Sequence, residues 1–234
     1  MLPVIAQVKI RFTYNSKVKI MTKRNSELTQ SRLLDAAEIV FGEFGYSASN
    51  LRQIATRAKV TPAMIKYYFK NKDGLYLSVF ARRAVPIMNE RESLLADYMK
   101  EHAPKAIPVE KIVHAFIFPP LSACKREKGA KWFIKLTARL HHEPVKLRRK
   151  IRQQFYNQTT QKFLQALRLA LPKESNSSLC WFLTFIMGIY TYVLSTPDRI
   201  EFLSEGKIKG EDYEKALPEI VRFCTRGFGC SDRF

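Results

Sequence analysis

Acidic residues are scarce in this chain, which has 21 Asp and Glu against 40 Lys and Arg over 234 residues. The resulting formal net charge of +19 is extreme for a small protein and favours an anionic partner, with nucleic acid as the first candidate. The alternative is that the basic residues only coat the exposed faces of helices. A hydrophobic content of 46% is ample for a core, and the length suits one large or two modest domains.

Cysteine is also rare. The four cysteines (Cys124, Cys180, Cys224 and Cys230) form no CxxC pair and are too sparse for a disulfide scaffold. The N-terminus has no sustained apolar run before a small-residue cleavage site, so no secretory signal is visible. We therefore expect a cytoplasmic protein with reduced thiols.

The residue sets of common enzymes are missing too. We find no nucleophile–base pairing, no glycine-rich phosphate loop and no convincing set of metal ligands. His141 and His142 are adjacent, so on a helix their side chains diverge by about 100° and cannot easily chelate together. Metal binding there is a minor alternative to a helix C-terminus with favourable dipole contacts. We expect no catalytic residue, no metal and no cofactor.

Long apolar runs are limited to residues 175–195. The uninterrupted part is shorter than the roughly 20 residues that span a bilayer, and Thr184, Gly188 and Thr191 interrupt it. A helix that is apolar all round in a soluble chain is buried in a core or a subunit interface. No membrane association is expected.

The most informative stretch is residues 50–69, which is predicted to form two short helices joined by a tight turn. Asn50 suits the N-cap of the first helix, Thr61 that of the second, and Pro62 its first position. One apolar stripe supports the first helix: Leu51, Ile54, Ala55 and Ala58.

The second helix has an unusual predicted surface. Ile65 and Phe69 are expected to be buried, which leaves four residues facing outward: Ala63, Lys66, Tyr67 and Tyr68. Small residues at its start allow close approach, and the cation and hydroxyls suit phosphates, so this helix fits a DNA major groove. Lys72 begins the next helix and is expected to bind phosphate.

In these features residues 30–80 resemble the DNA-binding domain of the TetR/AcrR family of bacterial transcriptional regulators. The resemblance rests on Ala36, Ala37, Phe41, Gly45, Tyr46, Ile54, Ala55, Ala58, Val60, Tyr68, Phe69, Lys72 and Leu75. Two positions depart from the family pattern: Lys59 stands where Gly is usual, and Lys66 where Tyr is usual.

The resemblance implies an all-α fold, with a three-helix helix-turn-helix head and a larger helical body for ligand binding and dimerisation. We expect a poorly ordered extension at 1–22, the DNA-binding domain at 23–72, and the effector-binding and dimerisation domain at 73–234. The predicted DNA-binding residues are Asn50, Arg52, Thr61, Pro62, Ala63, Lys66, Tyr67, Tyr68 and Lys72.

Helical periodicity continues through the body. A helix from residue 72 is expected to kink or divide at Pro86, and another to break at Pro119–Pro120. Long helices are predicted over 144–171, 175–195 and 212–228, with a polar loop at 196–210. The aromatic candidates for an effector pocket are Phe116, Phe118, Trp132, Phe133, Phe155, Tyr156 and Tyr190, although each one alone is more often simply core. The predicted dimer interface comprises Trp181, Phe182, Phe185, Ile189, Leu217, Ile220 and Val221.

Two stretches stay open. Residues 4–12 alternate in a strand-like period before a possible turn at 14–16, so 1–20 are interpreted as a disordered arm, as a segment ahead of a natural start at Met21, or as a basic arm on DNA. The basic run at 146–152 is either a second anion-binding patch or, preferably, a solvated helix face.

The sequence thus predicts a homodimeric transcriptional regulator that acts as a repressor. It would bind a pseudo-palindromic operator in double-stranded DNA and be released by a small-molecule effector. The alternative is a non-specific nucleic-acid-binding protein that acts through its basic surface.

Overall fold

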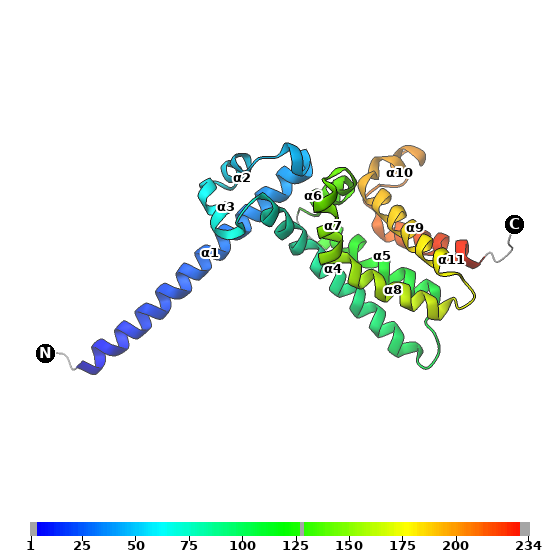
Figure 1. The fold of residues 1–234 in the computed structure, drawn as a ribbon, viewed down its shortest axis with the longest axis horizontal. Helices are drawn as coiled ribbons and strands as arrows, with labels where there is room; N and C mark the ends of the chain where they lie inside the picture. The colour runs from blue at the N-terminus through cyan, green and yellow to red at the C-terminus, as the bar shows by residue number, and fades with distance from the viewer. Residues whose placement is uncertain (1–3, 127–128, 230–234) are drawn as a thin grey trace.

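A computed structural model describes the backbone of residues 4–126 and 129–229, and every regular element in those ranges is a helix, as the sequence predicts (Figure 1). In chain order the helices are α1 (Val4–Ala48), α2 (Leu51–Ala58), α3 (Pro62–Phe69), α4 (Lys72–His102), α5 (Val109–Arg126), α6 (Ala130–Arg139), α7 (Val145–Ile151), α8 (Asn157–Ala170), α9 (Asn176–Ser195), α10 (Pro197–Leu203) and α11 (Tyr213–Gly229). A short 3-10 turn, Leu140–His142, follows α6, and a π-helical turn, Arg152–Tyr156, joins α7 to α8.

The head consists of the second half of α1, α2, α3 and the start of α4. Its apolar stripes meet in one buried cluster: Leu33, Ala37, Phe41, Ile54, Ala55, Ala58, Ile65, Phe69, Leu75 and Tyr76. The same cluster includes Leu136 and Leu140 near the end of α6 and Leu147 and Ile151 of α7. The head core is therefore continuous with the nearest part of the body.

The strand-like interpretation of residues 4–12 and the turn at 14–16 are wrong, because α1 begins at Val4. The physical reason lies in the composition of the segment. No proline or glycine occurs from Val4 to Phe41, so a helix nucleated by the buried stripe of the head propagates backward at little cost per residue. The predicted poor order of residues 1–22 stays a prediction.

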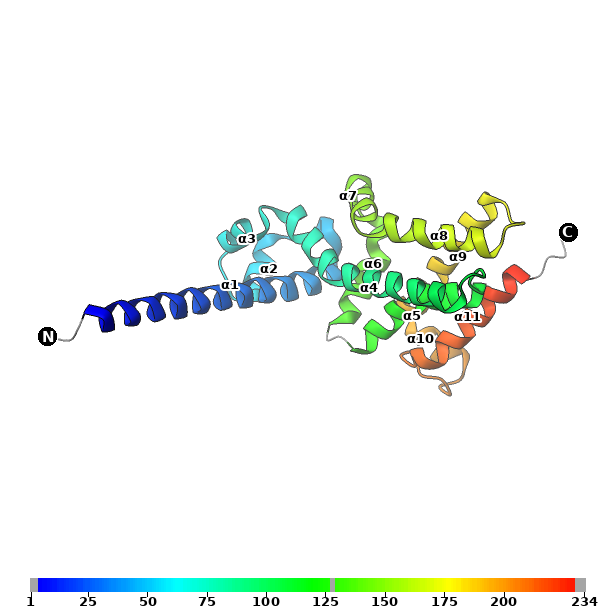
Figure 2. The ribbon, with the colours of Figure 1, turned by 90° about the horizontal axis from the view of Figure 1, so that it is seen from below.

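The body is layered around α4 and α5. Figure 2 shows α7 and α8 on one side of this pair and α10 and α11 on the other. Its core draws on α4, α5, α8, α9 and α11, with Phe116, Phe163, Leu167 and Phe182 all buried. Helix α4 runs from the head into this core (Figure 1), so it joins the two parts as expected, and Pro86 does not divide it.

Three predicted boundaries in the body are wrong. Helix α5 continues through Pro119–Pro120. The predicted helix over 144–171 is interrupted by the π-helical turn, where the wider spiral shifts the register of the side chains. The predicted loop at 196–210 contains α10, which begins with Pro197 at its first position.

Helix α9 is the most apolar element. By length and composition alone it is sufficient to cross a membrane, and 28% of its most apolar window is buried inside the protein. Its buried residues, which include Leu179, Phe182 and Ile186, pack on the body core. Its other face is exposed, so α9 is not buried all round within one chain.

Candidate nucleic-acid interface and effector pocket

Helix α2 starts with a complete capping box. The Asn50 side chain accepts a hydrogen bond from the Gln53 backbone N–H (2.9 Å), and the Gln53 side chain accepts one from the Asn50 N–H (3.0 Å). Both bonds satisfy amides that the first turn of a helix leaves unpaired. The Asn50 side chain is therefore engaged in the fold, whereas Arg52 beside it is exposed.

Lys59 makes the turn between α2 and α3. Its backbone is left-handed (φ 55°, ψ 47°), and its N–H is bonded to the carbonyls of Ala55 and Thr56. This is the C-cap conformation that glycine adopts without strain. The family-typical glycine is thus replaced here by a residue with a Cβ, without loss of the turn.

Helix α3 buries Ile65 and Phe69, as predicted, and presents its start to solvent. Thr61 occupies the N-cap and Pro62 the first position, as predicted, although the Thr61 side chain makes no capping hydrogen bond. The exposed side chains of this region are Thr61, Pro62, Ala63, Lys66 and Tyr67. Tyr67 is 77% exposed, so most of its side chain is accessible to a partner.

Tyr68 and Lys72 are held by other parts of the head. The Tyr68 hydroxyl hydrogen-bonds to that of Ser26 (3.0 Å). The Lys72 ammonium donates to the Ser49 carbonyl (2.5 Å) and lies 4.4 Å from the centre of the Tyr46 ring. Partial burial lowers the pKa of Lys72. Both residues brace α3 and α4 against α1, and their predicted phosphate contacts stay a prediction.

Tyr46 completes this bracing. Its hydroxyl donates to the Asp73 carboxylate, and burial together with that bond raises the pKa of Tyr46 to about 12. Its backbone N–H donates to the Glu143 carboxylate (2.7 Å), which is buried in the turn after α6. The head is therefore tied directly to the C-terminal end of α6.

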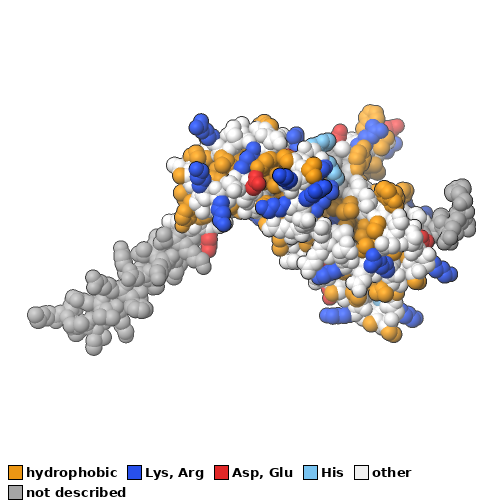
Figure 3. Space-filling view, viewed as in Figure 1, with side chains coloured by type: hydrophobic (Ala, Val, Ile, Leu, Met, Phe, Trp, Pro, Cys, Tyr) orange, Lys and Arg blue, Asp and Glu red, His pale blue; other side chains and the backbone are white. Residues whose placement is uncertain are grey.

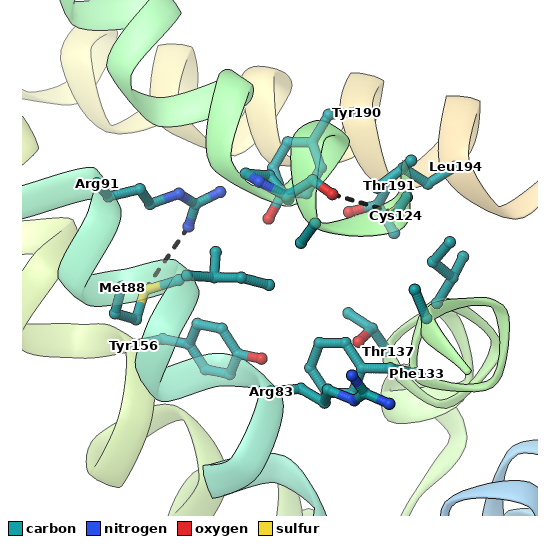
Figure 4. A pocket seen from close by; sticks show the side chains of 15 residues that line it. Arg83, Met88, Arg91, Cys124, Phe133, Thr137, Tyr156, Tyr190, Thr191 and Leu194 are labelled. Carbon is teal, nitrogen blue, oxygen red and sulfur yellow. Dashed lines mark hydrogen bonds between the residues drawn. The ribbon is translucent and has the colours of Figure 1, made fainter. Parts of the chain in front are cut away.

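A cavity lies in the body between α4, α5, α6, the π-helical turn and α9 (Figure 4). Its volume is about 60 Å³, room for only a few waters. Three of the predicted aromatics line it, Phe133, Tyr156 and Tyr190. Burial raises the pKa of Tyr156 strongly, with a further contribution from Tyr190.

The other predicted pocket aromatics lie elsewhere. Phe116 is core and packs on Phe163, while Phe118 stacks on His114. Trp132 lies against Gly42 of α1, where a Cβ on the glycine would come within 2.9 Å of the Trp132 carbonyl oxygen. Phe155 packs on the head core. These four are corrections to the predicted pocket.

Charged residues of the cavity were missed by reasoning from aromatics. Arg83 and Arg91 both line it from α4, together with Ile87 and Met88. A signal did exist, because Arg91 falls on the buried stripe that also holds Ala84, Met88 and Leu95. A basic residue on such a stripe indicates a buried charge with a special role.

The predicted dimer residues separate into two groups. Trp181 and Phe185 are 59% and 58% exposed, and Ile189 and Leu217 are half-buried. Phe182, Ile220 and Val221 are instead buried within this chain, so they support the exposed face from beneath. Phe223 of α11, 71% exposed, was missed and lies on the same groove as Trp181 and Phe185.

His141 and His142 follow α6 in the 3-10 turn, and both are exposed. Burial lowers the pKa of His141, with nearby arginines adding to the shift. Within the described part of the chain, no group of three or more His, Cys, Asp or Glu side chains is placed to hold a metal ion.

Comparison with known proteins agrees with this geometry. Residues 33–79 match the family model described as "Bacterial regulatory proteins, tetR family", and residues 114–227 match "Tetracyclin repressor-like, C-terminal domain". The chain belongs to the TetR family. The first of these models covers α2 and α3, so the head is the DNA-binding domain of a TetR-family regulator. This family consists of transcriptional regulators and not of enzymes.

Individual TetR-family proteins match over different lengths. The HTH-type transcriptional repressor NicS of Pseudomonas putida is 38% identical over 56 residues, which are 24% of this chain and 26% of that protein. The chain thus matches about a quarter of the length of such curated relatives.

Solved structures match over nearly the whole chain. NalD, the secondary repressor of the MexAB-OprM multidrug efflux pump in Pseudomonas aeruginosa, gives a TM-score of 0.61 at 20% identity and covers 87% of this chain and 97% of its own. FadR from Bacillus subtilis in complex with stearoyl-CoA gives 0.57 at 21% identity and covers 84% and 98%. At these identities the likeness establishes the fold.

Proposed function

We propose that this TetR-family chain is a cytoplasmic, homodimeric repressor that binds a pseudo-palindromic operator and is released by a small-molecule effector. The observation that carries the proposal is the exposed start of α3 on a basic head. Figure 3 shows Lys and Arg side chains spread over the head and α7, with few acidic side chains among them.

We assign the DNA contacts to residues of α2 and α3 whose side chains are exposed. Thr61, Pro62 and Ala63 are small and stand at the N-terminal end of α3, where a recognition helix meets base edges. Lys66, Tyr67 and Arg52 then reach phosphates. Asn50, Tyr68 and Lys72 support this surface from within the head and contribute contacts through their remaining hydrogen-bonding capacity.

Dimerisation would use α9 and α11. An apolar groove between them is lined by Trp181, Phe185, Ile189 and Phe223, and contiguous exposed apolar surface of this kind marks an interaction site. Covering it with a second copy explains why α9 is so apolar and makes a membrane partner unnecessary. The dimer would place two copies of α3 about 34–36 Å apart, or a multiple of that distance, on successive major grooves.

The effector would bind in the cavity beside α4. Ligand sites typically measure about 300–1,000 Å³, so the present cavity must widen before it holds one. Widening displaces α4 or α6, and both are connected to the head, α4 through the chain and α6 through the Glu143–Tyr46 hydrogen bond. An effector that prefers the widened arrangement would weaken DNA binding, typically by roughly 1–3 kcal/mol. The stearoyl-CoA complex of Bacillus subtilis FadR supports a ligand-binding role for this fold.

The alternative function, non-specific coating of nucleic acid through the basic surface, predicts no sequence preference. Selection of bound fragments from genomic DNA separates the two. A repressor enriches fragments that share a short palindrome, whereas a coating protein enriches none.

The first prediction concerns α3. Replacing Tyr67 or Lys66 with Ala should weaken operator binding without lowering thermal stability, because both side chains are exposed. A lost lysine–phosphate contact should reduce the slope of log K against log salt by about one for Lys66→Ala. Gel-shift titrations at several salt concentrations measure both effects.

Lys173→Ala, which removes an exposed charge far from the head, is the matched control and should leave the slope unchanged. Equal affinity for operator and scrambled duplex would contradict the proposal.

A further inference from the structure

The strongest unexplained feature of the cavity is Arg91, whose side chain lies among its lining residues in Figure 4. Arg91 is only 2% exposed. Its Nε donates to the Phe116 carbonyl (2.7 Å), and its Nη1 approaches the Met88 sulfur (3.7 Å). Its guanidinium carbon lies 3.9 Å from the centre of the Phe116 ring. The Nη2 atom is buried and has no hydrogen-bond partner.

One of these contacts has a structural explanation. Pro120 has no N–H, so the Phe116 carbonyl lacks its partner one turn further along α5. The Nε of Arg91 supplies the missing donor. A neutral amide would perform this task as well, so the repair accounts for a donor at this position but not for a positive charge.

The charge itself is unbalanced. Arg83, the other cation in the wall, bonds through Nε and Nη2 to the buried Glu38 carboxylate (2.8 and 3.0 Å). The neighbouring acids on α4 are engaged elsewhere, Glu90 with Arg126 (2.7 Å) and Glu92 with Lys162 (2.5 Å). None of the residues that line the cavity is acidic. Among the described residues, then, Arg91 has no counter-ion, a costly state for a buried charge.

Much of the remaining wall is apolar, and one further polar atom in it has no hydrogen-bond partner. Its apolar residues include Ile87, Phe133, Ile134 and Leu194. The Thr137 hydroxyl, which faces the same cavity, is also buried without a hydrogen-bond partner. The cavity therefore pairs an uncompensated guanidinium and a free hydroxyl with apolar walls.

We propose that this cavity binds an apolar monocarboxylate, with Arg91 as the anchor of the carboxylate. The inference deepens the proposed function by giving the chemical class of the effector. Arg Nη2 offers a charge-assisted hydrogen bond that suits a planar carboxylate, and one negative charge cancels the single unpaired positive charge. A dianionic phosphate would leave an excess negative charge in the apolar wall. The apolar part of the ligand replaces contacts between α4, α6 and α9.

The test uses ligand pairs of nearly equal size and shape that differ in the charge of the head group. Octanoate, decanoate and dodecanoate are each compared with their carboxamide by calorimetry on the full chain. The best-bound carboxylate should bind about 10- to 100-fold more tightly than its amide, the range expected for a hydrogen bond to a charged group. Arg91→Gln keeps a donor for the Phe116 carbonyl and should lose this preference, while Arg91→Lys should keep part of it. Lys100→Gln, which removes an exposed charge from the same helix, is the matched control.

The outcomes separate this inference from the proposed function. Operator binding that is weakened by the carboxylate in the unmodified chain, but not in Arg91→Gln, supports both. Operator binding with no preference for any carboxylate over its amide overturns the inference alone. A carboxylate preference that depends on Arg91, in a chain that ignores every duplex sequence, overturns the proposed function alone. Equal binding of carboxylates by Arg91→Gln and the unmodified chain shows that Arg91 is only the structural partner of α5 and overturns the inference.

Discussion

At the scale of single residues, Lys59 is where the chain departs from the pattern of its family at a measurable cost. A left-handed backbone costs a residue with a Cβ roughly 1 kcal/mol relative to glycine. Glycine also has more conformational freedom in the unfolded chain, and the loss of this entropy on folding offsets part of the stabilisation that relief of the backbone strain would give. We predict that Lys59→Gly stabilises the protein by about 0.5 kcal/mol, measured by urea unfolding. Lys66→Gly provides the control of opposite sign, because it places glycine inside α3 and should destabilise by about 1 kcal/mol. Destabilisation by Lys59→Gly would show that its side chain has a structural role.

The structural role of a residue was predictable wherever a short sequence pattern determines it. The cap at Asn50 and the burial of Ile65 and Phe69 follow from spacing within about ten residues of sequence, and the structure confirms them. For Arg91 the buried stripe of α4 could have indicated burial, but its contacts were not predictable. Its environment depends on Pro120 and on Tyr190, which lie on other helices, and one sequence does not show which helices meet. The hydrogen bond of Lys72 could not be predicted for the same reason, because its acceptor is the distant Ser49 carbonyl.

At the scale of elements, Asn50 at the start of α2 has two candidate roles, which substitutions can separate. The capping box assigns its side chain to the helix, whereas the family resemblance assigns the residue to DNA. We predict that Asn50→Ala lowers stability by about 1 kcal/mol, because an N-cap acceptor is lost. Asn50→Ser caps equally well and should restore both stability and operator affinity. Thermal unfolding and gel shifts of the two variants measure this. If Asn50→Ser is stable but binds operator poorly, the asparagine amide itself contacts DNA.

The sequence predicted which segments form helices, but it did not predict the residues at which several of these helices begin and end. Apolar periodicity identified most of the helices. It does not indicate whether a helix continues through a proline or where it ends in a polar segment. The unpaired Phe116 carbonyl of α5 is satisfied by a donor from α4, and local rules cannot anticipate that a helix survives in this way. Residues 4–12 show a period of two, yet they join a helix that is nucleated further along the chain. Here continuity with an ordered neighbour outweighs local alternation.

At the scale of the whole molecule, dimerisation through α9 and α11 would determine whether the protein binds one DNA half-site or two. Within this chain Trp181, Phe185 and Phe223 remain exposed over a buried support. Apolar side chains of this size contribute most to an interface when they are covered. We predict that the double replacement Trp181→Glu and Phe185→Glu yields a folded monomer by sedimentation, because both side chains lie outside the core.

The consequence for DNA binding follows from effective concentration. In a dimer the second half-site is bound intramolecularly, and losing that linkage typically weakens overall affinity by roughly 10²- to 10⁴-fold with no change in any single contact. The monomer should therefore bind an isolated half-site as the dimer does, but bind the full operator far more weakly. Phe202→Glu is the control for a glutamate on an exposed aromatic position, since Phe202 lies on α10 outside the groove. If Phe202→Glu dissociates the protein and the double variant does not, the subunits meet through α10, and the spacing of the two recognition helices must be derived from that surface.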